Sequence, residues 1–129
     1  MARQPIMPNA FTVFSLDAPA PASDEVLSAL RACGLTVDTT PLERAEHGRD
    51  WWPLTIPDVA RGHVPQWPGV VVRPSSSEDV SRVLEIASKH RVAVTAQGGR
   101  SNVVGGAVAP EGAIALDLTG LNRVLAIET

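Results

Sequence analysis

Residues 70–102 read VVVRPSSSEDVSRVLEIASKHRVAVTAQGGRSN, and this stretch decides the fold. The apolar run Val70–Val72 is short and is ended by Pro74, which is typical of a buried strand. A second apolar run, Val92–Thr95, has the same character. The helical segment between them is long enough to cross back over a sheet. We therefore predict a compact β-α-β unit over residues 70–95, with its two strands parallel.

The segment between those strands has the signals of an amphipathic helix. Ser75 and Ser76 each have an acidic residue three positions on, so either could cap the helix. Apolar residues then recur at the helical spacing i, i+3, i+4, i+7. We expect these residues to face the core: Val80, Val83, Leu84 and Ala87.

The part of the chain before residue 67 is divided into two segments. Residues 1–22 are rich in proline and alanine and predict a loosely attached arm, with one strand at Phe11–Leu16 pinned to another part of the molecule. Residues 23–66 should begin with a helix capped by Ser23 and stopped by Gly34. One face of this helix would carry Val26, Leu27, Leu30 and Cys33, with the cysteine buried as a small apolar side chain.

Residues 38–69 hold five of the eleven prolines and all three tryptophans. Few regular elements survive that density of proline, so we expect an ordered but irregular segment. Trp51, Trp52 and Trp67 should pack against a neighbouring surface, with stacking on a ligand as the alternative. Farther along, we predict a strand at Ala113–Leu118 and a last strand at Val124–Ile127.

A glycine-rich loop follows the second strand of the β-α-β unit. Gly98 and Gly99 would permit positive φ and close approach, so that main-chain N–H groups could converge on an anion. The sequence lacks the G-x-x-x-x-G-K-[ST] of a P-loop and a G-x-G-x-x-G that opens a helix. The loop alone is equally compatible with a phosphate site and with a plain turn.

The order of motifs resembles the flavin domain of the vanillyl-alcohol-oxidase, or PCMH-type, FAD-linked oxidoreductases. That family runs strand, helix, strand, a "PxGGGTS" loop and a strand ending in "LDL". The corresponding residues here are Pro68–Pro74, Ser77–Val80, the loop, Ile114–Leu118 and Leu121–Val124. His47-Gly48-Arg49-Asp50 upstream looks most like the alkylglycerone-phosphate synthase and D-lactate/glycolate dehydrogenase branch. The resemblance implies an α+β fold, in which residues 67–129 form the first part of a PCMH-type FAD-binding domain after a helical, proline-rich lead-in.

The resemblance also implies the contacts to the FAD pyrophosphate, made mostly through main-chain N–H groups. Carried over position by position, they fall on seven residues: Ala96, Gln97, Gly98, Gly99, Arg100, Ser101 and Asn102. Ala96 replaces the usual proline, Arg100 replaces the third glycine, and Ser101 and Asn102 replace Thr and Ser. Covalent flavoproteins of the superfamily have a histidine at or near the position of Arg100, so the resemblance implies non-covalent FAD.

In the whole protein, the resemblance implies hydride transfer from a small 2-hydroxy-acid-like substrate to the flavin. The alkylglycerone-phosphate branch would instead imply a redox-neutral exchange of an acyl for an alkyl group. We expect this chain to be a fragment that lacks the cap region, with no catalytic residue of its own. Its partners would be FAD and that missing region, from the same protein or a partner chain. Two alternatives are a non-catalytic truncated remnant and a UDP-N-acetylenolpyruvoylglucosamine reductase-like flavoprotein.

Composition restricts the remaining classes. A net charge of −3 argues against nucleic acid as a partner. No apolar run reaches the roughly 20 residues that a membrane span needs, and no signal peptide is recognisable, so a cytoplasmic protein is expected. The single cysteine cannot form an internal disulfide. The three histidines lack the spacing of metal ligands, and we predict no metal site.

Overall fold

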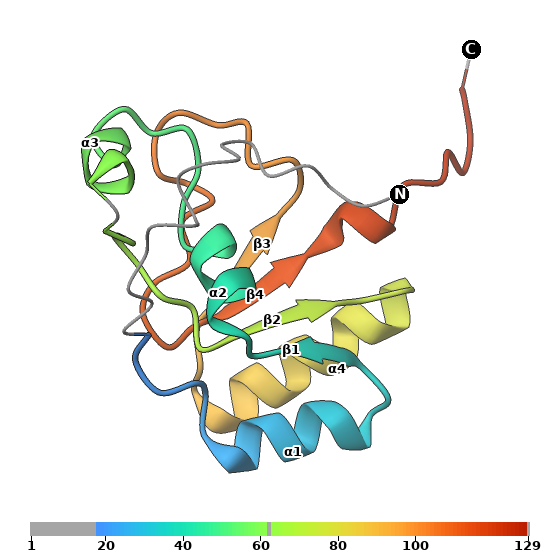
Figure 1. Ribbon diagram of the computed structural model, residues 1–129. Coiled ribbons are helices and arrows are strands. Elements are labelled where there is room, and N and C mark those ends of the chain that lie inside the picture. Colours follow the sequence, from blue (N-terminus) through green and yellow to red (C-terminus); the bar gives the residue numbers. More distant parts are fainter. Residues whose placement is uncertain (1–17, 62, 129) are drawn as a thin grey trace.

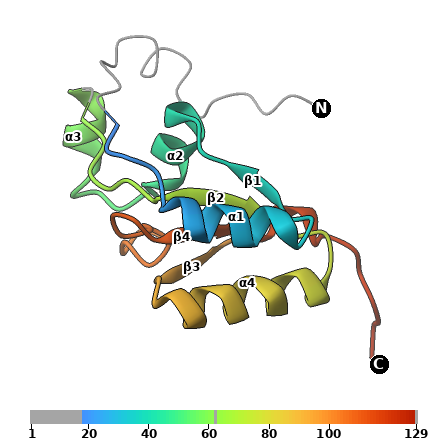
Figure 2. The same cartoon turned by 90° about the horizontal axis from the view of Figure 1, so that it is seen from below.

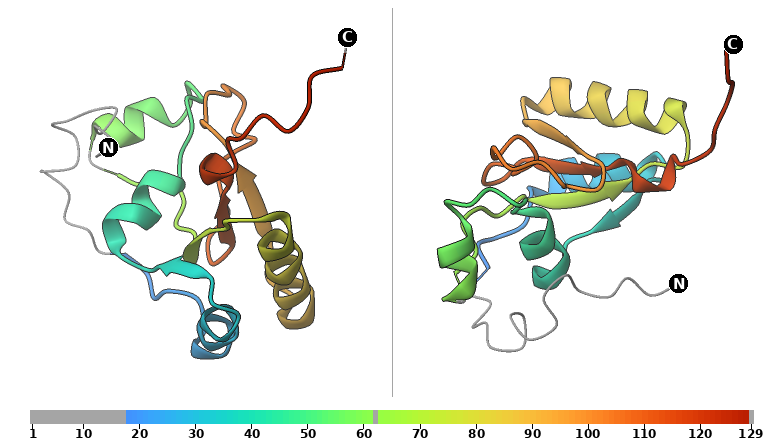
Figure 3. Two further views of the ribbon diagram at one scale, coloured as in Figure 1. Left: turned by 90° about the vertical axis from the view of Figure 1, so that its right-hand side faces the viewer. Right: turned by 90° about the horizontal axis from the view of Figure 1, so that it is seen from above.

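The computed structural model describes residues 18–61 and 63–128 (Figure 1). A four-stranded mixed sheet lies at its centre, with helices α1 and α4 on one face. Figure 3 shows α2 and α3 on the side of the sheet opposite α4. This mixed architecture confirms the predicted α+β class. In chain order the elements are α1 (Asp24–Ala32), β1 (Thr36–Asp38), α2 (Pro41–His47), α3 (Ile56–Ala60), β2 (Val70–Arg73), α4 (Ser77–His90), β3 (Val94–Gln97), β4 (Ile114–Asp117) and the 3-10 turn η1 (Leu118–Gly120).

The sheet has the order β1-β2-β4-β3. Strands β2 and β3 each pair in parallel with β4, while β1 runs antiparallel along β2. The two strands of the β-α-β unit are therefore parallel, as predicted, but β4 is inserted between them. Strand β3 begins two residues later than expected, because the chain first leaves α4 through the left-handed Arg91 (φ 54°). The carboxyl ends of the three parallel strands share one edge of the sheet.

The main core lies between the sheet and helices α1 and α4, which Figure 2 shows side by side. Alternation along β2 sends Val70 and Val72 into this core and Val71 to the opposite face. Ser76 is the residue that caps α4, since its hydroxyl accepts a hydrogen bond from the Asp79 N–H at 3.1 Å. The predicted inner face of α4 is correct at Val83 and Ala87 but wrong at Leu84, which is half exposed.

Two further expectations were wrong. Cys33 is exposed, because it caps the C-terminus of α1 and the helix stops before its side chain can reach the core. Val124–Ile127 forms no strand, and Val124 and Ile127 are among the most exposed apolar residues of the described chain. A fifth strand has nowhere to pair beside β4, because β2 and β3 occupy both of its edges. The strand expected at Phe11–Leu16 lies outside the described residues.

The proline-rich segment is more regular than predicted. Helix α2 has Pro41 as its first residue and α3 has Pro57 as its second. Proline is tolerated there because the first N–H groups of a helix have no intrahelical partner. Two of the tryptophans pack against neighbouring residues, as expected. The ring of Trp52 lies on Gly105, and the Arg44 Cζ lies 5.7 Å from the centroid of the Trp67 ring.

Candidate functional site

The glycine-rich loop leaves the carboxyl end of β3 and returns to β4 at Ile114. Of the seven predicted contact residues, Ala96 and Gln97 belong to β3, and the loop proper begins at Gly98. Gly98, Gly99 and Ser101 are exposed, whereas Gln97 is buried. The carboxyl end of a parallel strand is where open α/β sheets bind ligands, so the loop lies in the expected place.

Gly98 and Gly99 would permit positive φ, but neither adopts it. Among the described loop residues from 98 to 102, only Arg100 is left-handed, with φ 53°. The residue that stands in place of a third glycine therefore adopts the conformation that favours glycine. For an L-residue this conformation costs roughly 1 kcal/mol.

The open side of the loop has free hydrogen-bond donors. The main-chain N–H groups of Gly98, Gly99 and Ser101 form no hydrogen bond with any other described residue. A Cβ added at Gly98 or Gly99 would meet no atom within 4 Å. Unpaired N–H groups beside open space fit an anionic group such as a pyrophosphate.

Gln97 holds the base of the loop. Its Nε2 donates to the carbonyl oxygens of His47 at 2.8 Å and Ala107 at 2.6 Å. Both N–H bonds of the amide are thereby used, and the side chain is almost fully buried. Its Oε1 is buried and has no hydrogen-bond partner among the described residues. Gln97 thus joins the start of the loop to its middle part and to the end of α2.

Arg100 turns its charge toward helix α2. Its Nη1 donates to the Glu46 carbonyl oxygen at 2.8 Å, and its Nη2 lies 3.9 Å from Glu46 Oε2. The side chain is largely buried against that helix. The guanidinium of Arg100 therefore has its protein partners at the end of helix α2.

The strain at Arg100 leads to a prediction. Arg100→Gly should be more stable than Arg100→Ala by about 1 kcal/mol, because both lose the guanidinium contacts but only glycine relieves the left-handed backbone. Urea denaturation of the two variants measures the difference. The matched control is Ser101, whose φ is not positive. There alanine should be the more stable replacement, and the same order at position 100 would contradict the prediction.

Asn102 is held by Asp50. Its Nδ2 donates to Asp50 Oδ2 at 2.8 Å, and its carbonyl oxygen accepts from the Trp51 N–H at 3.1 Å. The other oxygen of Asp50 accepts from the Trp52 N–H at 2.8 Å. The structure therefore joins the His47–Asp50 motif to the loop, although 52 positions separate Asp50 from Asn102. The spacing of the two motifs in the sequence gave no indication of this contact.

A buried charged cluster lies beneath the loop, at the end of β4. Asp117 Oδ2 is 3.3 Å from both His47 Nε2 and Arg73 Nε, and Oδ1 accepts from the Thr119 hydroxyl at 2.6 Å. Burial by itself would raise the pKa of Asp117. The hydrogen bonds from His47 and Thr119 outweigh burial, so the pKa lies well below its ordinary value. Asp117 is the aspartate of the "LDL" motif, and sequence reasoning had assigned it no contact.

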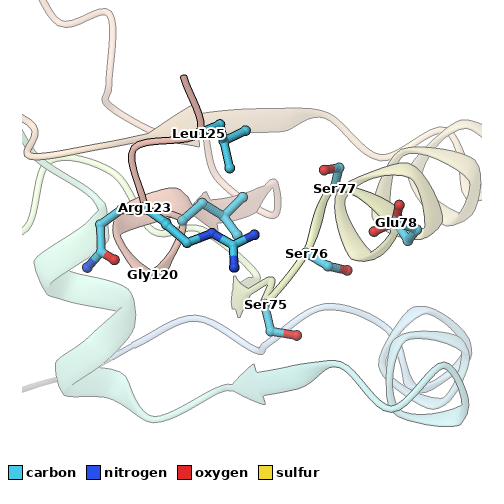
Figure 4. Close-up of a pocket in the computed structure, with 9 residues that line it drawn as sticks. Ser75, Ser76, Ser77, Glu78, Gly120, Arg123 and Leu125 are labelled. Carbon is cyan, nitrogen blue, oxygen red and sulfur yellow. The ribbon is translucent and has the colours of Figure 1, made fainter. Parts of the chain in front are cut away.

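A pocket of about 660 Å³ opens elsewhere on the same edge of the sheet (Figure 4). It lies between the start of α4 and the chain after η1, and none of the seven predicted contact residues lines it. Its lining is Ser75, Ser76, Ser77, Glu78, Gly120, Leu121, Asn122, Arg123 and Leu125.

Within residues 18–61 and 63–128, no three His, Cys, Asp or Glu side chains are grouped to hold a metal ion. None of the helices in that same part of the chain is long and apolar enough to span a bilayer.

Comparison with known proteins gives the context of this loop. Residues 68–129 match the family described as FAD binding domain. D-2-hydroxyglutarate dehydrogenase of Xanthomonas citri pv. viticola is 35% identical over 91 residues, which are 70% of this chain and 17% of that protein. The chain thus spans about a sixth of that relative's length.

Solved structures show the same fold. Alkyldihydroxyacetonephosphate synthase superposes with a TM-score of 0.81 at 26% identity, over 91% of this chain and 23% of its own. p-Cresol methylhydroxylase superposes with a TM-score of 0.65 at 20% identity, over 86% of this chain and 22% of its own. The matched family, the relatives and the shared fold agree with the motif order of the sequence. From residue 68 onward, the chain therefore matches the FAD binding domain family, as the order of its motifs predicted.

Proposed function

We propose that this chain holds the pyrophosphate of FAD with residues Ala96–Asn102, as the first part of the flavin site of an FAD-dependent oxidoreductase. The observation that carries the proposal is the set of unpaired N–H groups at Gly98, Gly99 and Ser101, beside open space. These groups supply directed donors without a fixed positive charge, which suits a pyrophosphate. The side chains of Gln97 and Arg100 support the loop from behind.

We further propose that the cofactor is bound non-covalently. The three histidines of the chain are His47, His63 and His90, and none lies in the loop. Arg100, at the position where covalent relatives have histidine, directs its side chain to Glu46. The rest of the flavin site and the substrate pocket would come from the cap region, in the same protein or in a partner chain. A cytoplasmic location and the division at residues 22 and 66 remain predictions from the sequence.

For the whole protein, we propose oxidation of a small 2-hydroxy acid. The similarity to D-2-hydroxyglutarate dehydrogenase supports this substrate class. Bound FAD would supply the hydride acceptor for the substrate C–H bond. This chain would contribute cofactor binding and no catalytic residue.

A second candidate is the redox-neutral exchange of an acyl for an alkyl group. It is favoured by the superposition on alkyldihydroxyacetonephosphate synthase, which covers 91% of the chain. The two candidates are separated by supplying the whole protein with D-2-hydroxyglutarate and an electron-accepting dye. Reduction of the dye that depends on the hydroxy acid supports the dehydrogenase, whereas an exchange reaction produces no net reduction.

Gly98→Ala tests the site itself. The added methyl group meets no protein atom and the backbone is not left-handed, so stability should change by less than about 0.5 kcal/mol. The methyl group would nevertheless intrude on a bound pyrophosphate and should weaken FAD binding by at least about tenfold. Titration of flavin fluorescence with the 129-residue chain measures the affinity.

The matched control is Gly120→Ala, where the added Cβ makes only an ordinary contact, 3.6 Å from the Pro74 oxygen. This variant should bind FAD like the unsubstituted chain. Equal affinities of the Gly98 and Gly120 variants would show that the loop does not hold the phosphates. A chain that binds no FAD would favour the non-catalytic remnant.

A further inference from the structure

The last two residues of α2 and the chain that follows them, residues 46–52, are called the turn below. This turn lies directly behind the glycine-rich loop, and several contacts join the two segments. We propose that this turn shapes the loop in the free protein and that Asp50 is its positioning residue, acting through Asn102. The inference rests on the proposed function for its purpose, since a preformed loop presents its N–H groups before the ligand arrives. The loop's shape in the free protein can nevertheless be tested by itself.

Residues 100 and 102 of the loop contact the turn, whereas residue 101 between them does not. Arg100 donates to the Glu46 carbonyl oxygen, and Asn102 donates to the Asp50 carboxylate, each at 2.8 Å. Ser101 lies between them and is exposed. Residues 100 and 102 therefore face the turn while Ser101 faces outward, and its N–H group has no partner within residues 18–61 and 63–128.

Contacts within the turn fix the orientation of the Asp50 carboxylate. Asp50 is buried, and its second oxygen is already fixed by the Trp52 N–H at 2.8 Å. The orientation of the carboxylate is thus set within the turn, independently of the loop. Trp52 also reaches the far end of the loop, because its ring covers Gly105, which is left-handed with φ 78°.

The position of a charged Asp50 close to the proposed pyrophosphate site requires an explanation. A carboxylate close to a pyrophosphate is unfavourable unless something separates the two. Both oxygens of Asp50 are engaged by protein N–H groups, and the Asn102 amide takes one of them. A hydrogen bond to an ionised acceptor is shorter and stronger than one between neutral groups. The charge of Asp50 therefore strengthens the hydrogen bond that holds Asn102, on the side of the loop away from its open face.

Trypsin reports directly on the shape of the loop, because the bond after Arg100 is a potential cleavage site. Cleavage of a folded protein follows the population of the locally open form. Asp50→Asn should speed cleavage after Arg100 by about tenfold, since it weakens a charge-assisted hydrogen bond. Cleavage after the exposed Arg123 should not change and provides the internal reference.

The sharper test exchanges the two side chains. Asn102→Asp alone places two carboxylates opposite each other and should loosen the loop at least as much as Asp50→Asn. The double variant Asp50→Asn/Asn102→Asp restores a hydrogen bond in the reverse direction, from the new amide to the new carboxylate. It also leaves an oxygen at position 50 for the Trp52 N–H. Its cleavage rate after Arg100 should return to within about twofold of the unsubstituted chain.

Asp58→Ala is the matched control, because in the described part of the chain the Asp58 side chain pairs only with the exposed Arg61, at 3.7 Å. It should leave both cleavage rates unchanged. The inference is overturned if Asp50→Asn cleaves like Asp58→Ala, or if the double variant cleaves as fast as the singles. Titration with FAD then tests the proposed function separately. If the unsubstituted chain fails to bind FAD while the cleavage results hold, the proposed function fails and the positioning role of Asp50 stands.

Discussion

Gly48→Ala is expected to destabilise the protein by about 3 kcal/mol or more, the upper part of the range for overpacking a buried site. Gly48 follows α2 and is buried. A Cβ at this position would lie 1.9 Å from the main-chain oxygen of Gln66 and 3.0 Å from its carbonyl carbon. Real Cβ atoms do not approach main-chain atoms so closely, so one of the two segments would have to move.

Neither segment can move without breaking other contacts. On one side, the Gly48 N–H is bonded to the Ala45 oxygen at the end of α2. On the other, the chain after Gln66 is held at two carbonyl oxygens: Trp67 accepts from Gly112, and Pro68 accepts from the buried Arg44. The cost arises from this close approach and not from backbone conformation, because Gly48 has an ordinary φ of −85°.

Urea denaturation followed by tryptophan fluorescence measures the effect. Gly98→Ala is the comparison, since its added Cβ has open space around it. Gly48→Ala should therefore lower the stability of the protein, whereas Gly98→Ala should lower its affinity for FAD. A denaturation midpoint for Gly48→Ala equal to that of the unsubstituted chain would show that residues 48 and 66 are not in contact.

Local signals explain what the sequence could predict. Ser23 and Ser76 are hydroxyl residues that precede acidic ones, and both cap helices as expected. Val70–Val72 and the glycine-rich loop are likewise recognisable within a few residues. The order of these elements predicted the resemblance to the FAD binding domain family, which residues 68–129 match.

Long-range contacts explain what the sequence could not predict. The partner of Asn102 is 52 positions away and that of Gln97 is 50 positions away, so neither side chain's use is visible locally. Val124–Ile127 has the composition of a strand, but both edges of β4 are already taken. Arg100 takes the left-handed conformation that its neighbouring glycines would permit, and its side chain contacts Glu46, 54 positions away.

Asp117→Asn should have the second large effect, a loss of about 3 kcal/mol at pH 7, typical of breaking a buried charged network by removing one partner. The carboxylate is almost fully buried between His47 and Arg73. An amide at this position offers one oxygen where the carboxylate offers two. The His47 imidazole would then face a neutral group in a buried site, so it loses more than a surface ion pair would lose. Arg73 is partly exposed and keeps its ion pairs with Glu43 and Asp38, so it loses less.

The pH dependence shows whether the charge of Asp117 is the cause. Its pKa is lowered in the folded protein, so its stabilisation is present above the unfolded-state pKa of about 3.9. That stabilisation is lost as the pH falls through the folded-state pKa. The unsubstituted chain should therefore lose stability below about pH 4 more steeply than Asp117→Asn does.

Asp79 separates this effect from acid sensitivity in general. Hydrogen bonds from Ser75 lower the pKa of Asp79 as well, but it lies at the exposed start of α4. Asp79→Asn should therefore reduce the acid sensitivity too, while costing much less stability at pH 7 than Asp117→Asn. Urea denaturation at pH 3, 5 and 7 provides the three comparisons. If the free energies of unfolding of Asp117→Asn and of the unsubstituted chain changed in parallel with pH, removal of the central charge would have left the proton linkage unchanged. Such a result would mean that packing, and not the charge of Asp117, holds the buried network together.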